Sequence, residues 1–165
     1  MRAKRPVRLT AIVLSMSALL MAAAPVAGAN PAPIKVNVVD CVFDGGATTV
    51  QAGRPFLLDA GWAALTLRHE ALFFLSQRTV ASINGVPIRH ADWYWHFPQK
   101  TYPFPDLPWN MSWDYPVKAL ATGQSITVGY EWFLRFKVSD GVDTYPRGPV
   151  LAPLGATPTC VITAE

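Results

Sequence analysis

A regular alternation of apolar and polar side chains between Ser125 and Ser139 limits the folds open to this chain more than any other feature. In the stretch "SITVGYEWFLRFKVS", an apolar side chain occupies every second position. A period of two is typical of a β-strand that buries one face and turns the other toward water. We expect one side of this sheet to meet solvent, because the second face is mostly polar. The positions expected to face the interior are Ile126, Val128, Tyr130, Trp132, Leu134, Phe136 and Val138.

A hairpin is predicted at the Asn84-Gly85 pair. The pair lies between two strand-like runs in "TVASINGVPIRH". A type I′ turn needs a positive φ at both central residues, which Asn-Gly adopts readily. Ile83 and Val86 should pair across the turn. Pro87 has no amide hydrogen, so we expect its arm to lie at a sheet edge.

Most of the remaining segments also predict strands. "IKVNVVDCVF" and "TCVITA" are expected to be the first and last strands, and "RPFLLDAGW" another. One segment departs from the pattern. "TLRHEALFFLSQ", residues 66–77, has leucines near helical spacing and predicts a short helix with Thr66 as its N-cap.

The first 29 residues have the composition of a secretory signal peptide. A basic "MRAKRPVR" is followed by an apolar "LTAIVLSMSALLMAAA" and by small residues before a cleavage site after Ala29. The apolar run is short for a membrane span, which favours a cleaved signal over a retained anchor. We therefore expect a single secreted, extracellular domain over residues 30–165, with no membrane attachment after cleavage.

Charge argues against a nucleic-acid partner. Four of the fourteen basic residues and none of the eleven acidic ones lie in the signal, which leaves residues 30–165 with a net charge of −1. The basic footprint that binds a phosphate backbone is absent.

The chain has two cysteines, Cys41 and Cys160. Two cysteines fit an exported protein in an oxidising compartment. An intramolecular disulfide is the simplest assignment, and it would enclose nearly the whole domain. Two free thiols, or thiols paired between molecules, are the alternative.

Short strands separated by turn signals, with one clasp between the ends, predict an all-β fold. We expect an immunoglobulin-like β-sandwich of about seven to nine strands, with one short helix and a long loop rich in aromatic residues and proline. The motifs "AGW", "INGVPI", "WDYP", "LATGQSITVGYEW", "SDG" and "CVITA" together resemble small exported bacterial domains of this type, whose function is uncharacterised. The resemblance spans most of the chain after the signal. It implies no catalytic residue, because none is assigned in such domains.

Aromatic residues gather between Ala91 and Pro116. The alternation in "HADWYWHF" places Trp93, Trp95 and Phe97 on one face of a predicted strand, where burial is most stabilising. After Phe97 a proline recurs every few residues, which predicts a long loop over residues 98–116. Flat rings on a stiff loop can stack on sugars or grip peptides. The alternative is that the loop folds over a sheet edge and closes the core. The candidate ligand-binding residues are Tyr102, Phe104, Trp109 and Trp113.

Signatures of catalysis and of metal binding are missing. The chain has no G-x-S-x-G elbow, no H-E-x-x-H pair and no glycine-rich phosphate loop. We predict no catalytic residue, no cofactor and no metal. His90, Asp92 and His96 share the polar side of the predicted strand. The two histidines would be about 20 Å apart on an extended chain, too far to share one ion.

The sequence thus favours a non-catalytic extracellular module that binds or assembles through the loop over residues 98–116. The expected ligand is a polysaccharide, or a protein or peptide. One alternative is a small secreted hydrolase that pairs carboxylates at the rim of the sandwich, as glycosidases do. Another is a purely structural envelope protein. The rim carboxylates available to a hydrolase are Asp92, Asp106, Asp114 and Glu131.

Overall fold

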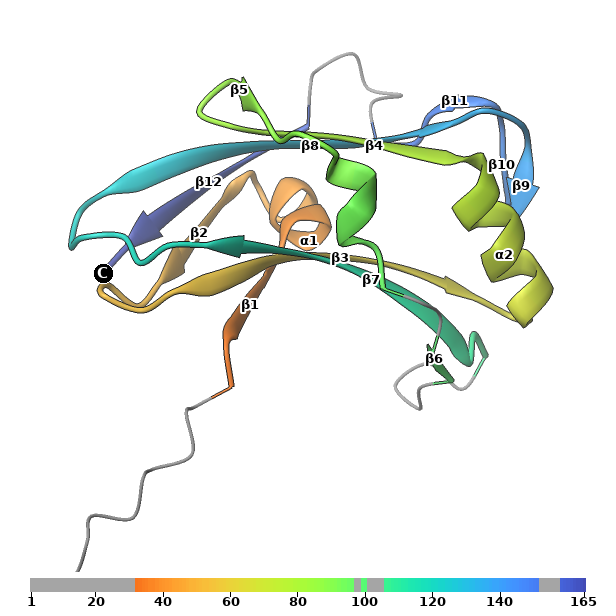
Figure 1. The fold of residues 1–165 in the computed structure, drawn as a ribbon, viewed down its shortest axis with the longest axis horizontal. Helices are drawn as coiled ribbons and strands as arrows, with labels where there is room; N and C mark the ends of the chain where they lie inside the picture. Colours follow the sequence, from red (N-terminus) through yellow and green to blue (C-terminus); the bar gives the residue numbers. More distant parts are fainter. Residues whose placement is uncertain (1–31, 97–98, 101–105, 152–157) are drawn as a thin grey trace, which may run out of the picture. The chain divides into compact units, whose positions relative to one another are not determined.

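β-Strands dominate the part of the chain that the computed structural model describes, which is residues 32–96, 99–100, 106–151 and 158–165. These residues belong to one compact unit that begins at Ala32. Two sheets lie one above the other, and a helix occupies one end (Figure 1). The expectation of a mostly β fold is therefore confirmed.

The first sheet is built around one long antiparallel ladder. In spatial order it contains β1 (Ile34–Asn37), β3 (Phe56–Ala64), β7 (Trp109–Val117) and β6 (Gln99–Lys100). All nine residues of β3 pair with β7. The first strand, β1, runs parallel to β3, and β6 pairs with only the first two residues of β7.

The second sheet is centred on the strand that the alternation predicted. Its spatial order is β2 (Ala47–Val50), β12 (Thr159–Ala164), β8 (Ser125–Leu134), β4 (Gln77–Ile83) and β5 (Val86–Pro87), and β11 (Gly148–Pro149) also pairs with β8. A separate short ladder joins β9 (Val138–Ser139) to β10 (Thr144–Tyr145). Along β8, the five interior positions from Ile126 to Leu134 are buried, as expected. The expectation that Phe136 lies inside was wrong, because the strand ends at Leu134 and the ring beyond it is exposed.

Aromatic contacts join the two sheets and form the centre of the core. Trp62 of β3 meets Trp132 of β8 edge to face, with ring centroids 6.3 Å apart. Trp113 of β7 packs on Tyr130 of β8, with centroids 4.8 Å apart. Burying large rings from both sheets supplies much of the apolar area that holds two sheets face to face.

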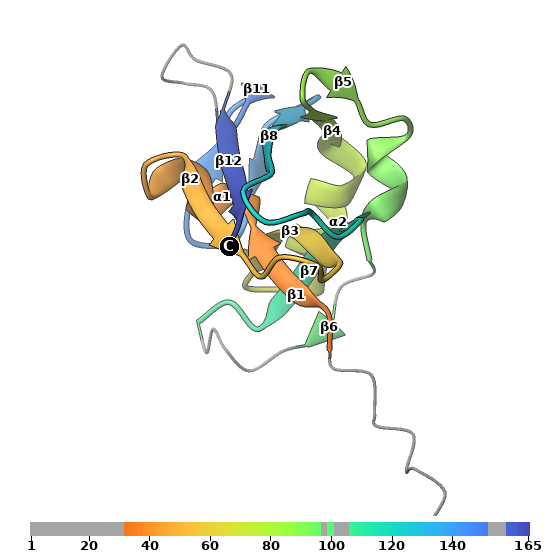
Figure 2. The ribbon, with the colours of Figure 1, turned by 90° about the vertical axis from the view of Figure 1, so that its left-hand side faces the viewer.

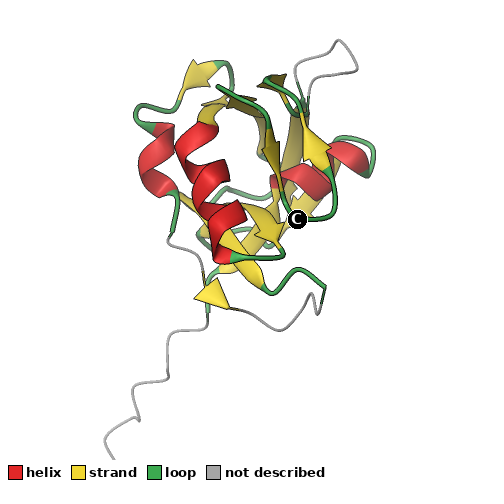
Figure 3. Cartoon of the chain, turned by 90° about the vertical axis from the view of Figure 1, so that its right-hand side faces the viewer, coloured by secondary structure: helices red, strands yellow, loops and turns green. Residues whose placement is uncertain are grey.

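The predicted helix is present as α2 (Leu67–Ser76), at the end of the fold seen in Figure 3. The Thr66 hydroxyl accepts the His69 amide hydrogen bond at 3.3 Å, as an N-cap does. Phe73 of this helix stacks on Trp62, with centroids 4.1 Å apart and the planes nearly parallel. The helix therefore adds its own ring to the inter-sheet core.

A second helix, α1 (Val38–Phe43), replaces the end of the predicted first strand. The Asn37 side chain accepts hydrogen bonds from the amides of Val39 and Asp40, at 3.0 and 3.1 Å. This N-cap ends β1 and starts the helix. Cys41 therefore lies on a helix, and the expectation that it lies on a strand was wrong.

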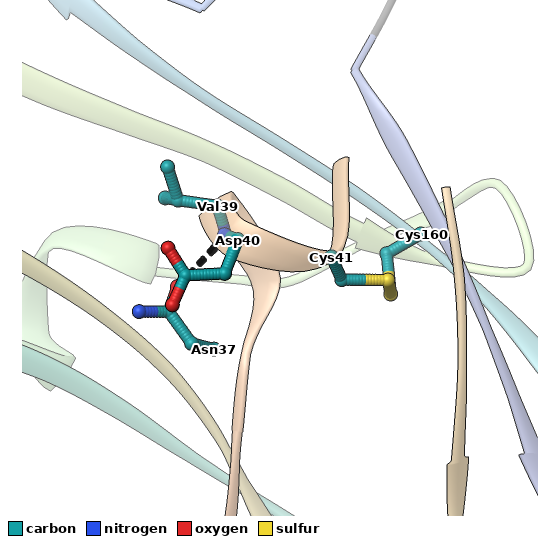
Figure 4. Close-up of a disulfide and its surroundings, with 5 residues drawn as sticks. All are labelled: Asn37, Val39, Asp40, Cys41 and Cys160. Atoms are coloured by element: carbon teal, nitrogen blue, oxygen red, sulfur yellow. Dashed lines mark hydrogen bonds between the residues drawn. A yellow bond between two sulfur atoms is a disulfide. The ribbon is translucent and has the colours of Figure 1, made fainter. Parts of the chain in front are cut away.

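The predicted disulfide between Cys41 and Cys160 is confirmed (Figure 4). It joins α1 to β12, and their Cα atoms are 5.7 Å apart. Figure 2 shows α1 beside β2 and β12. The two cysteines are 119 positions apart in the sequence. Closing so long a loop restricts the unfolded chain strongly.

The hairpin is confirmed in its turn, its pairing and its position. Asn84 and Gly85 have φ values of 50° and 76°. Ile83 pairs with Val86. The arm that contains Pro87 is β5, at the edge of the six-stranded sheet.

Both predictions for the aromatic segment need correction. Residues 91–94 form a 3₁₀ helix, η1 (Ala91–Tyr94), instead of part of a strand. Trp93 and Trp95 consequently differ in burial, and Trp93 is 77% exposed while Trp95 is 8% exposed. Phe97 lies outside the described residues.

The end of the predicted loop is in fact the strand β7. A proline is tolerated there because Pro116 is the second-last residue of β7, where a missing amide hydrogen costs little. The alternative, in which this segment closes the core, describes β7 better than an open loop does.

Candidate functional site

A cavity of about 820 Å³ opens on the outer face of the six-stranded sheet. We call it the arginine cavity. Three of its side chains are arginines from three different segments, and an exposed phenyl ring lies among them. The lining residues are Arg78, Val80, Asp92, Phe133, Leu134, Arg135, Arg147 and Gly148.

Strand register explains why these side chains meet. Phe133 on β8 is paired with Arg78 on β4 on one side and with Pro149 on β11 on the other. Residues paired across strands point to the same face of a sheet. The neighbours of Phe133 along β8 face the core, so all three of these side chains lie on the outer face. Phe133 is 41% exposed, although it is a large apolar ring.

Two of the arginines flank strands that pair with each other. Arg135 comes directly after β8 and Arg147 directly before β11, so both lie at the same end of this ladder, and both line the cavity. Like charges gathered on one surface repel each other. In the described part of the chain, none of the three arginines of the cavity makes an ion pair. The cavity therefore holds positive charge that no ion pair within the described residues balances.

The two nearby carboxylates accept hydrogen bonds from backbone amides. Asp92 lines the cavity, and its Oδ1 accepts the Thr79 amide hydrogen bond at 2.6 Å. Glu131, on the outer side of β8, accepts amide hydrogen bonds through one oxygen from Trp132, Val150 and Leu151, at 2.8–3.0 Å. Glu131 is buried by these contacts, so the expectation of a wet outer face was wrong at this position.

A second, smaller cavity of about 440 Å³ lies on the outer face of the four-stranded sheet. Its charges are matched. Asp59 of β3 pairs in register with Asp114 of β7. The Lys35 ammonium lies 3.1 Å from Asp59 Oδ1 and 2.7 Å from Asp114 Oδ1. His96 Nε2 is 3.4 Å from the other oxygen of Asp114.

The two carboxyl groups of this cluster have opposite pKa shifts. Burial, and after it the hydrogen bond with Asp114, raises the pKa of Asp59. Burial also acts to raise the pKa of Asp114, but hydrogen bonds from Asp59 and Lys35 outweigh it and bring that pKa below its usual value. Asp59 and Asp114 lie directly opposite each other in the ladder, and the Lys35 ammonium contacts both carboxylates. The three side chains therefore form one ion-pair network.

A third environment is the interior beside α2, where Glu70 is fully buried. In the described part of the chain neither oxygen of its carboxyl group has a hydrogen-bond partner, and neither does the indole nitrogen of Trp62. Burial raises the pKa of Glu70 to about 8. This carboxyl group is therefore mainly neutral at neutral pH.

Comparison with known proteins gives no relative: no protein-family model, no curated protein and no solved structure matches the chain. Within the described residues, no helix has both the length and the apolar character that a membrane crossing requires.

The structure separates the predicted aromatic residues. Tyr102 and Phe104 lie outside the described residues. Trp109 is half-buried at the start of β7. Trp113 is fully buried, and its indole nitrogen donates to the Ala91 carbonyl at 2.7 Å. The expectation that Trp113 presents an open ring was therefore wrong, because β7 turns it into the core.

Two of the exposed rings, Trp93 and Phe133, were not among the predicted binding residues. Trp93, expected inside, projects to solvent and stacks on His90, with centroids 4.3 Å apart. Phe133 lies on the face of β8 that the alternation predicts to be mostly polar. An aromatic residue on an otherwise charged strand face is the signal that could have drawn attention to it.

The polar residues grouped by the sequence also separate. Asp114 belongs to the four-stranded sheet, whereas Glu131 belongs to the six-stranded one, so the four rim carboxylates do not gather in one site. His90 stacks on Trp93, Asp92 bonds to Thr79, and His96 lies near Asp114. Among the described residues, no three groups of the kinds that ligate metals come together.

Proposed function

We propose that this protein is a non-catalytic extracellular binding module with an immunoglobulin-like sandwich fold, and that it binds its ligand in the arginine cavity. The proposed binding site is thus on the outer face of the six-stranded sheet, and not in the aromatic loop that the sequence predicted. The disulfide between Cys41 and Cys160 and the signal-like first 29 residues support export to an oxidising compartment.

One observation carries the proposal: Phe133 is exposed between cationic side chains that have no ion-pair partner among the described residues. A folded protein gains nothing by itself from an exposed phenyl ring or from like charges set side by side. A ligand that covers the phenyl ring and neutralises the guanidinium groups would bury the apolar surface and balance the positive charge. A cavity of this size is within the range typical of ligand sites.

The hydrolase remains the second candidate because Asp59 and Asp114 form a carboxyl pair with divergent pKa values. Such divergence is a mark of acid–base pairs. Here Lys35 binds both groups, which also accounts for the divergence as an ion-pair network.

A binding screen on residues 30–165 tests the proposal. The protein is applied to immobilised neutral polysaccharides, anionic polysaccharides and peptides, and retention is compared with that of Phe133→Ala. Phe43→Ala is a matched control, because Phe43 is also exposed but lies on α1, outside the cavity. We expect retention on at least one material, lost in Phe133→Ala and kept in Phe43→Ala.

The competing functions give different results in the same screen. Shortening of a retained material, measured by mass spectrometry, would favour the hydrolase. Absence of retention on every material would contradict the binding proposal and favour a structural protein. Retention that survives Phe133→Ala would place the binding site elsewhere.

A further inference from the structure

We infer that the occupant of the arginine cavity is a carboxylated polysaccharide, of the uronic-acid class. The inference rests on the proposed binding function and adds the chemistry of the ligand. It follows from three features of the cavity: exposed arginines with no ion-pair partner among the described residues, an exposed phenyl ring, and a carboxylate that can accept a hydroxyl hydrogen bond.

The arginines of the cavity favour an anion. Arg135 and Arg147 both line the cavity, and both are exposed. A guanidinium group binds a carboxylate through two parallel N–H···O bonds, which a flexible ammonium cannot reproduce. A carboxylate that reaches these arginines would offset their positive charge and gain charge-assisted hydrogen bonds.

The cavity has apolar surface beside its cationic groups. Phe133 and Val80 both line it, and Phe133 pairs in register with Arg78. The exposed phenyl ring of Phe133 offers a flat apolar face. A pyranose ring has an apolar face of C–H groups and carries its acidic group at the rim. Such a ring can lie on Phe133 while its carboxylate reaches the arginines.

Asp92 distinguishes a sugar from other anions. Its Oδ1 is used by the Thr79 amide, and in the described part of the chain its Oδ2 has no hydrogen-bond partner. A free carboxylate oxygen in a cationic cavity repels a densely charged chain such as polyphosphate. It accepts a hydrogen bond from a hydroxyl group, of which a uronic acid has several.

Backbone pairing argues against a peptide. The cavity lies on the face of β4, β8 and β11, and β8 is paired on both sides there. An extended peptide is usually recognised by adding a strand to an open sheet edge. This face has no such edge at β8, so recognition must come from side chains, as it does for saccharides.

Calorimetric titration of residues 30–165 with oligogalacturonate tests the inference. The matched neutral probe is the methyl ester of the same oligomer, which keeps the ring and removes the charge. We expect the ester to bind at least about tenfold more weakly. We expect affinity for the acid to fall by about tenfold between about 50 mM and about 300 mM NaCl, because part of the attraction is screened.

Variants assign the effect to the cavity. The double variant Arg135→Gln/Arg147→Gln should lose about tenfold to a hundredfold in affinity, since two charge-assisted contacts are removed. Arg135→Lys/Arg147→Lys should lose part of that, because lysine keeps the charge but not the fork. Arg54→Gln is a control for charge outside the cavity, because it removes one positive charge in the turn before β3. Far-ultraviolet circular dichroism confirms that each variant is folded.

Other outcomes overturn the inference and leave the proposed function distinguishable. Equal binding of the acid and its ester would remove the carboxylate claim while binding in the cavity stands. Binding of polyphosphate or poly-L-glutamate as tight as that of oligogalacturonate would exclude a sugar-specific site. Failure of every anionic probe, with retention of a neutral polysaccharide, would reject the inference alone, and failure of all materials would reject both.

Discussion

The two outer faces of this protein balance their charges in different ways. On the four-stranded sheet, Lys35 lies between Asp59 and Asp114, so cation and anions occur together. On the six-stranded sheet, Arg135 and Arg147 line one cavity and have no ion-pair partner among the described residues. A face whose charges are matched internally contributes to the fold. A face with unmatched charge is available to a ligand, at some cost to stability.

Glu70 is a third case, in the interior, where a buried carboxyl group has no hydrogen-bond partner in the described part of the chain. Burial raises its pKa from 4.5 to about 8. The unfolded chain therefore ionises Glu70 at a lower pH than the folded protein does. Compared with a neutral side chain at this position, Glu70 costs no stability below about pH 4.5. As the pH rises from there to about 8, Glu70 lowers the free energy of unfolding progressively.

We expect Glu70→Gln to have the largest effect on stability. At about pH 9 the variant should be more stable than the parent by about 3–5 kcal/mol, and at about pH 4 the two should be equal. Urea unfolding at several pH values measures this. Glu131→Gln is the comparison, because one oxygen of the buried Glu131 accepts three amide hydrogen bonds while the other has no partner among the described residues. A pH-independent difference would show that Glu70 has partners in solution.

The second expectation concerns Glu131. Its carboxylate on the six-stranded face is hydrogen-bonded to backbone amides, whereas the arginines of the cavity have no ion-pair partner among the described residues. Glu131→Ala removes the acceptor of three amide hydrogen bonds. The Val150 amide keeps its bond to the Trp132 carbonyl, whereas the Leu151 amide loses the acceptor that it has among the described residues. We expect a loss of about 2–4 kcal/mol in the free energy of unfolding. Arg78→Ala, on the paired strand of the same face, should change it by less than about 0.5 kcal/mol. Equal losses in the two variants would remove the distinction.

The third expectation concerns removal of the ion pairs on the four-stranded face. Lys35→Met leaves Asp59 and Asp114 opposite each other without their shared cation. We expect a loss of about 1 kcal/mol near neutral pH, a modest value because the Lys35 side chain is half exposed. The loss should shrink below about pH 4, where the carboxylates become protonated. Thermal unfolding of parent and variant at both pH values decides this, and a loss that persists in acid would point to packing instead.

The sequence predicts the parts of this fold in which one local rule acts alone. β8 buries a single face, so its period of two is visible in the letters, and Asn84-Gly85 specifies its own turn. The predicted N-cap at Thr66 likewise depends on residues three positions apart. Each of these features needs no knowledge of distant segments.

The aromatic segment shows where local rules fail. Trp93 and Trp95 do alternate with polar residues in the sequence, but contacts with distant segments determine the local structure. Asp92 bonds to the Thr79 amide, and Trp113 bonds to the Ala91 carbonyl, which together hold η1 in place. The same contact draws Trp113 into the core, so its burial could not be inferred from the prolines around it.

The arginine cavity was beyond sequence reasoning for a related reason. Arg78, Arg135 and Arg147 are far apart in the chain and meet only through the register of three strands. One of these strands, β11, is two residues long and has no readable pattern. Only Phe133, on the polar face of β8, gave a local sign that this surface differs from an ordinary solvated one.

The smallest expected effect tests the unmatched face directly, without any ligand. If Arg147 is repelled by Arg135, then Arg147→Gln should stabilise the unliganded protein, by up to about 0.5 kcal/mol. The gain should fall as salt is added, because exposed charges are screened over about 8–10 Å at moderate ionic strength. Chemical unfolding at low and high salt measures it, and Arg54→Gln controls for the general change in net charge. A loss of stability in Arg147→Gln at low salt would mean that Arg147 has an anionic partner within the chain. The six-stranded face would then be matched like the other one, and the reason for placing a ligand there would be gone.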